Sequence, residues 1–156
     1  MIIGVVYTMA ISGLSRLTQK EENLSLFTLK EYLSEQNSTV SAKIICLDEC
    51  ESCDLYLDGN KSKTIQSFLD DDVRTYRYEF SYGFVQKNDE VYFNAEGIDE
   101  DVCFSYELFK NGVGDQVVVE YKNKVYDFSS YFEGVKVFNS LSEAQEQREN
   151  IQSDLR

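Results

Sequence analysis

The clearest structural signal in the chain is the stretch Tyr76-Arg-Tyr-Glu-Phe-Ser-Tyr-Gly-Phe84, in which every even-numbered position is aromatic. The positions between carry an arginine, a glutamate, a serine and a glycine. Successive side chains of a β-strand point to opposite faces of a sheet, so this alternation predicts one continuous strand with an aromatic face. We expect that face to belong to the core rather than to a platform for stacking bases or sugars.

Further β-rich segments follow this stretch at short intervals. Turn-forming pairs separate several of them, namely Asn88-Asp89, Glu96-Gly97 and Asn111-Gly112. The segments are 90–95, 102–109, 116–122, 124–128 and 134–138. Their succession predicts an antiparallel meander, with closure into a small barrel as an alternative.

The chain before the aromatic stretch has a mixed pattern. Residues 2–8 and 40–47 are predicted to be strands, and 18–36 a helix that opens with the capping box Thr18-Gln-Lys-Glu21. Apolar side chains in 61–71 predict a second, short helix that three aspartates, 70–72, bring to an end. We therefore expect a small β-α-β portion at the N-terminus. Its apolar first strand lacks the basic residues of a targeting segment and is shorter than the ~20 residues of a membrane span.

A second capping box, Ser140-Leu-Ser-Glu143, predicts a C-terminal helix. Its apolar stripe (Leu141, Ala144, Ile151, Leu155) is thin, and Arg148 interrupts it. The expected fold class is α+β: a β-α-β portion, an antiparallel aromatic-rich sheet and a terminal helix. We expect one domain over 1–156, with these three parts at 1–72, 73–139 and 140–156.

Composition and charge exclude several functions. There is no histidine, which removes Ser-His-Asp and Cys-His triads and histidine-containing zinc sites. The 28 acidic and 15 basic residues leave a formal charge of −13. A field of that sign repels nucleic acid and anionic membranes and attracts basic proteins. We expect a soluble cytoplasmic protein, a monomer or small homo-oligomer, without a cofactor.

Four cysteines form the first candidate site. Cys46, Cys50 and Cys53 lie within eight residues of one another and Cys103 is the fourth thiol of a possible metal site. The C-x3-C-x2-C spacing resembles that of radical S-adenosylmethionine enzymes, which implies an iron–sulfur cluster. The chain departs from that family in its short length and in Ser52, which stands where an aromatic residue is usual. Neighbouring acids oppose thiolate formation, so we expect reduced structural thiols.

Carboxylates form the second candidate site. The strand Val117-Val-Val-Glu120-Tyr-Lys122 resembles the E-x-K strand of the PD-(D/E)xK nuclease family. That resemblance implies Mg²⁺ held by Glu120 and an upstream acid, Asp101 or Asp115, with Lys122 assisting the attacking water. The alternative is a strand whose Glu120 and Lys122 are solvated on the outer face.

Two acidic stretches without a basic residue, 48–58 and 89–107, carry the main functional prediction. We expect a non-catalytic protein that masks the basic, nucleic-acid-binding surface of an enzyme or toxin, as inhibitors, immunity proteins and phage anti-defence proteins do. The metal-dependent hydrolase and a structural or assembly protein are the alternatives. The predicted partner-binding acids are Asp48, Glu49, Glu51, Asp54, Asp58, Asp89, Glu90, Glu96, Asp99, Glu100 and Asp101.

Overall fold

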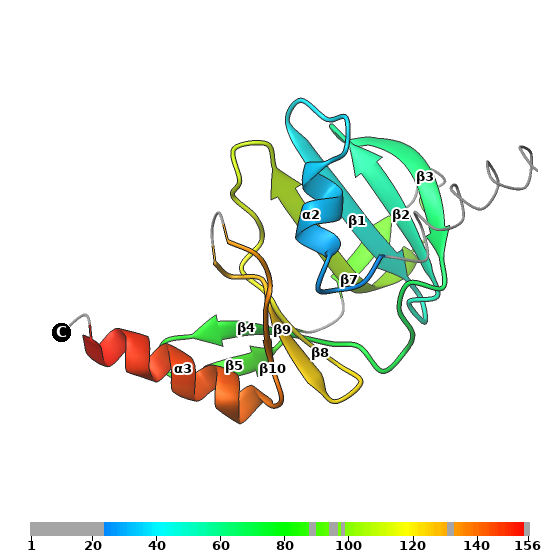
Figure 1. The fold of residues 1–156 in the computed structure, drawn as a ribbon. Helices are drawn as coiled ribbons and strands as arrows, with labels where there is room; N and C mark the ends of the chain where they lie inside the picture. Colours follow the sequence, from blue (N-terminus) through cyan, green and yellow to red (C-terminus); the bar gives the residue numbers. More distant parts are fainter. Residues whose placement is uncertain (1–23, 88–89, 94–96, 98, 131–132, 155–156) are drawn as a thin grey trace, which may run out of the picture.

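The computed structural model describes residues 24–87, 90–93, 97, 99–130 and 133–154, and it has an α+β architecture (Figure 1). Among these residues, two antiparallel sheets contain five strands each, and two helices accompany them. Sheet A has the order β3 (Asn60–Gln66), β2 (Ser52–Leu57), β1 (Ser41–Leu47), β7 (Asp99–Phe109), β6 (Glu90–Phe93). Sheet B has the order β10 (Lys136–Phe138), β9 (Lys124–Asp127), β8 (Val118–Tyr121), β4 (Arg74–Glu79), β5 (Gly83–Gln86). The predicted fold class is confirmed.

Helix α2 (Leu29–Ser34) lies across one face of sheet A (Figure 1). Leu29 and Leu33 of this helix, and Leu26 in the turn before it, are buried in the core. The helix predicted over 18–36 is thus shorter among the described residues, because 24–28 form coil and turn. The predicted first strand, 2–8, and the capping box at Thr18 lie outside the described residues. Within the described part of the chain, no helix is long and apolar enough to cross a membrane.

The two sheets share one core. Tyr106 of β7 in sheet A is fully buried, and its ring centroid lies 4.9 Å from that of Phe128, which directly follows β9 of sheet B. Val117 and Val119 belong to the same core, whereas Val118 packs on the opposite face of sheet B. Because successive side chains of a strand point to opposite faces, both faces of β8 are buried. One face packs in the core shared with sheet A, and the other packs with helix α3.

The segment 61–71 is a strand and a loop rather than the predicted helix. Asp58 and Gly59 both have positive φ values, 54° and 84°, which close a tight hairpin between β2 and β3. In β3 only Ile65 is buried, because this strand forms the edge of sheet A. The apolar residues of 61–71 have a helical spacing, but the Asp58-Gly59 turn before them leads into a strand.

The aromatic stretch 76–84 is a hairpin rather than one continuous strand. Strand β4 ends at Glu79, and Gly83 begins β5 with a φ of 76°. Tyr78 and Phe84 consequently face each other across the hairpin, with ring centroids 5.4 Å apart. Phe80 and Tyr82 lie at its tip and are 73% and 81% exposed, so they are not in the core as predicted.

The strands also pair differently from a meander. Strand β7 returns to sheet A and pairs with β1 along nearly its whole length, with Ile44 opposite Tyr106. The strands predicted at 90–95 and 102–109 are present over the described residues, as β6 and β7, but they belong to the sheet of the N-terminal half. The described strands form two open sheets and no closed barrel.

Helix α3 (Leu141–Asp154) packs on sheet B, and its predicted capping box is present. The Glu143 backbone N–H donates to the hydroxyl of Ser140 at 3.1 Å, and the Glu143 carboxylate accepts from the backbone N–H of Asn139 at 2.8 Å. The sequence predicts that Arg148 interrupts the apolar stripe of this helix, but the residue contributes to the contact with sheet B. Its guanidinium carbon lies 4.8 Å from the ring centroid of Tyr78 and forms part of the packing.

Candidate functional site

All four cysteines are in disulfides. Cys46 and Cys53 stand directly opposite each other in β1 and β2 and are bonded to each other. Cys50, in the turn between these strands, is bonded to Cys103 of β7, 53 residues away. The prediction of reduced thiols is wrong, and the paired sulfurs do not supply the thiolates that a zinc ion or an iron–sulfur cluster requires.

The second disulfide fastens an acidic turn to β7. The β1–β2 turn carries Asp48 and Glu49, and both Asp48 and Cys50 adopt positive φ values, 55° and 66°. The backbone N–H of Asp48 donates to the carbonyl of Asp101 at 2.8 Å. Together, the disulfide and this hydrogen bond hold the turn against the start of β7.

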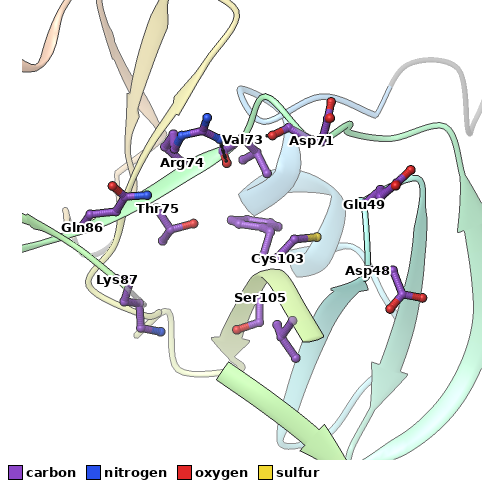
Figure 2. A pocket seen from close by; sticks show the side chains of 12 residues that line it. Asp48, Glu49, Asp71, Val73, Arg74, Thr75, Gln86, Lys87, Cys103 and Ser105 are labelled. Atoms are coloured by element: carbon purple, nitrogen blue, oxygen red, sulfur yellow. Dashed lines mark hydrogen bonds between the residues drawn. The ribbon is translucent and has the colours of Figure 1, made fainter. Parts of the chain in front are cut away.

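A cleft of about 330 Å³ opens beside this turn, between sheets A and B. Figure 2 shows Asp48, Glu49 and Asp71 along one side, and Thr75, Gln86 and Lys87 along the other. Cys103 and Ser105 of β7 lie between the two sides (Figure 2). The remaining lining residues are Val73, Arg74, Val102 and Phe104.

The acidic side of the cleft carries uncompensated charge. Asp48, Glu49 and Asp71 are exposed, and within the described part of the chain no ion pair neutralises them. Arg74 is directed elsewhere, because its guanidinium donates to the backbone carbonyls of Asp71 and Val73 at 3.1 and 3.2 Å. We call Asp48, Glu49 and Asp71 the acidic rim.

Polar groups of the opposite wall add hydrogen-bonding capacity. The hydroxyl of Thr75 is buried and has no hydrogen-bond partner among the described residues. It points toward the interior of the cleft in Figure 2. Gln86 presents its amide at the same wall. The cleft thus combines an acidic rim of three carboxylates with a wall of hydrogen-bonding groups that also carries Lys87. The excess of acidic groups suits a cationic group better than an anion.

The two acidic stretches of the sequence meet at one end of sheet A. Asp48, Glu49 and Glu51 are exposed on the β1–β2 turn, and Asp101 is exposed on the adjacent β7. The backbones of Glu90, Asp99 and Glu100 lie in β6 and β7, where Glu90 pairs with Val102. Asp89 and Glu96 lie outside the described residues. The sequence analysis did not identify Asp71, Thr75, Gln86 or Lys87, which only the pairing of distant strands brings to the cleft.

Asp58 and Asp54, two of the predicted partner-binding acids, have structural contacts instead. The carboxylate of Asp58 accepts hydrogen bonds from the backbone N–H groups of Thr39 and Val40, which lower its pKa to about 2. Asp54 pairs with Lys61 at 3.2 Å and accepts from the hydroxyl of Thr64 at 2.8 Å. These two carboxylates are engaged within the protein.

The carboxylates expected to share Mg²⁺ in a PD-(D/E)xK nuclease lie on separate elements. Asp101 lies in sheet A and Glu120 in sheet B, and the carboxylate of Asp115 accepts from the backbone N–H of Glu107 at 3.0 Å. Lys122 lies in the β8–β9 turn and pairs with Asp70 at 3.2 Å. Glu120 is half-buried and Lys122 is exposed, which fits the alternative of a structural strand better than a magnesium site.

Asp70, Asp71 and Asp72 are the only group of three acids whose oxygens, in the described part of the chain, lie within 4.8 Å of one another. The carboxylate of Asp70 accepts from the backbone N–H of Asp72 at 2.9 Å, and this hydrogen bond is the main cause of its lowered pKa. Asp70 also pairs with Lys122. The group therefore shapes the loop before β4 and directs Asp71 toward the cleft.

Comparison of the chain with protein-family models, with curated proteins and with solved structures finds no match. The site is thus a cleft between two antiparallel sheets, and its acidic rim includes a turn that two disulfides hold within sheet A.

Proposed function

We propose that this chain is a non-catalytic binding protein that uses the acidic rim and the neighbouring turn to engage a basic protein surface. The observation that supports this most directly is the convergence of Asp48, Glu49 and Asp71, from two separate loops, on one cleft without compensating ion pairs among the described residues. A partner that binds nucleic acid presents arginine and lysine side chains where phosphates bind. Carboxylates of the rim would occupy those phosphate positions.

The rigidity of the β1–β2 turn favours a role in binding a protein surface. The turn that carries Asp48 and Glu49 is held by Cys46–Cys53 on one side and by Cys50–Cys103 on the other. A surface that is already ordered loses less conformational entropy on binding than a mobile loop does. The carboxylates are therefore presented at nearly fixed positions to the partner.

The two disulfides also indicate the kind of cellular compartment in which the protein occurs. Disulfides form and persist in oxidising environments and are rare in the cytosol. We infer an oxidising compartment for the folded chain, in place of the cytoplasmic location predicted from the sequence. Protein taken from its native cells under acid quench and alkylated should carry four unmodified cysteines. Four alkylated cysteines would contradict the inference.

A charge-matched pair of variants tests the binding proposal. D48N/E49Q/D71N neutralises the rim, and E35Q/E146Q/D154N removes the same charge from exposed positions at the ends and faces of the helices. Binding of a basic ribonuclease and of an arginine-rich peptide is measured by titration calorimetry at low and high salt. The wild type and the helix variant are expected to bind both probes in a salt-sensitive manner.

The rim variant is expected to bind about tenfold more weakly, since three exposed charge pairs contribute about 0.5 kcal/mol each. Equal weakening by both variants would show general attraction to a negative protein, and the proposed function would then be wrong. Failure of the wild type to bind either probe would also contradict it.

A further inference from the structure

The four cysteines differ in their access to solvent. Cys46, Cys50 and Cys53 are completely buried in the core, whereas Cys103 is only partly buried and lines the cleft. The sulfur of Cys103 lies in the middle of the cleft in Figure 2. A dissolved reagent can therefore approach one sulfur of one disulfide without unfolding sheet A.

We propose that Cys50–Cys103 is a thiol-exchange site, opened from the cleft by a small thiol while Cys46–Cys53 stays closed in the folded protein. The thiolate of the reagent attacks Sγ of Cys103 and forms a new sulfur–sulfur bond with it. The bond between Cys103 and Cys50 breaks, and its electron pair leaves on Sγ of Cys50, which takes a proton from solvent. The product is a mixed disulfide on Cys103 and a thiol at Cys50.

A dithiol carries the reaction one step further. Its second thiolate attacks the reagent's own sulfur in the mixed disulfide, and Cys103 leaves as a thiolate. The reagent is oxidised to a disulfide, and Cys50 and Cys103 are reduced by the two electrons it supplies. The shielding of Cys46 and Cys53, both fully buried, keeps the other pair out of this exchange.

The acidic rim selects among thiols by charge. Asp48, Glu49 and Asp71 line the same cleft as Cys103 and give it a negative potential, which Arg74 and Lys87 offset in part. A thiol that carries an ammonium group is attracted into the cleft, and one that carries a carboxylate is repelled. This selectivity depends on the charges that line the cleft and is independent of any protein partner.

The order of opening is tested on the complete folded protein. Cysteamine is added under native conditions, samples are quenched with acid, free thiols are alkylated, and peptides are analysed by mass spectrometry. Early samples are expected to carry cysteamine on Cys103 and the alkyl group on Cys50, with Cys46 and Cys53 still bonded. Opening of Cys46–Cys53 first, or of both disulfides together, would overturn the proposal.

Charge selection is tested with cysteamine, 2-mercaptoethanol and mercaptoacetate, which are cationic, neutral and anionic. Each rate is divided by the rate of the same thiol with an unstrained linear disulfide, which removes its intrinsic reactivity. Cysteamine is expected to exceed mercaptoacetate by about tenfold, and this ratio should fall several-fold in D48N/E49Q/D71N but not in E35Q/E146Q/D154N. Equal normalised rates for the three thiols with the wild type would show that the cleft is not the route of attack.

Discussion

The guanidinium of Arg148 in α3 lies 3.1 Å from the carboxylate of Asp127 in β9 and forms an ion pair that is largely shielded from water. Asp127 is only 6% exposed, and Arg148 also lies over the rings of Tyr78 and Phe84. Arg148 therefore joins helix α3 to sheet B by an ion pair with Asp127 and by contacts with two aromatic rings.

Replacement of Arg148 by methionine is therefore expected to destabilise the protein. The change leaves the Asp127 carboxylate buried without its cation, and loss of one partner of a buried pair costs about 3 kcal/mol. Urea denaturation measures the free energy of unfolding, and Glu146→Ala on the exposed side of the same helix is the control, with a change below about 0.5 kcal/mol. A stability of R148M equal to that of the control would contradict the role of the ion pair.

Asp58 should make the folded state sensitive to acid. Its folded pKa of about 2 lies below the ordinary value of 3.8, so its stabilising contribution is complete above pH 3.8. The contribution is lost as the pH falls from 3.8 toward 2. Thermal unfolding of the wild type and of Asp58→Asn is compared across this range. The wild type should lose its advantage over the variant as acid is added, and a difference that does not change with pH would contradict the assignment.

The two disulfides are expected to contribute unequally to stability. In the chain-entropy description, a bond that closes a loop of 53 residues stabilises by about 4 kcal/mol and one that closes a loop of seven by about 2.5 kcal/mol. C50S/C103S should thus be less stable than C46S/C53S in urea denaturation. The opposite order would show that packing of the buried sulfurs outweighs loop closure.

The tip of the β4–β5 hairpin should tolerate polar substitution. Phe80 and Tyr82 are mostly exposed, so F80S/Y82S is expected to change the free energy of unfolding by less than about 0.5 kcal/mol. Phe84→Ala, which removes a ring packed against Tyr78 and Arg148, is expected to cost about 2 kcal/mol or more. A large loss in F80S/Y82S would favour the continuous aromatic strand predicted from the sequence.

Local features were predicted well because they depend on neighbouring residues. The capping box at Ser140 requires only a hydroxyl and a carboxylate three residues apart, and strand 40–47 is recognisable from its own β-rich composition. The two incorrect segments also have local causes. In 61–71 the helical spacing of apolar residues competes with the short turn signal Asp58-Gly59. In 76–84 the alternation of aromatic residues competes with Gly83, whose φ is positive.

The amino-acid sequence by itself determined the α+β class, most strand positions, the terminal helix and the excess of negative charge. Only the tertiary structure decided that β7 joins β1, that Cys50 is bonded to Cys103, and that Asp71 lies beside the same cleft as Asp48 and Glu49. Strand propensity, helix capping and charge are properties of short segments. Pairing between segments 50 residues apart depends instead on which buried surfaces fit together in the whole chain.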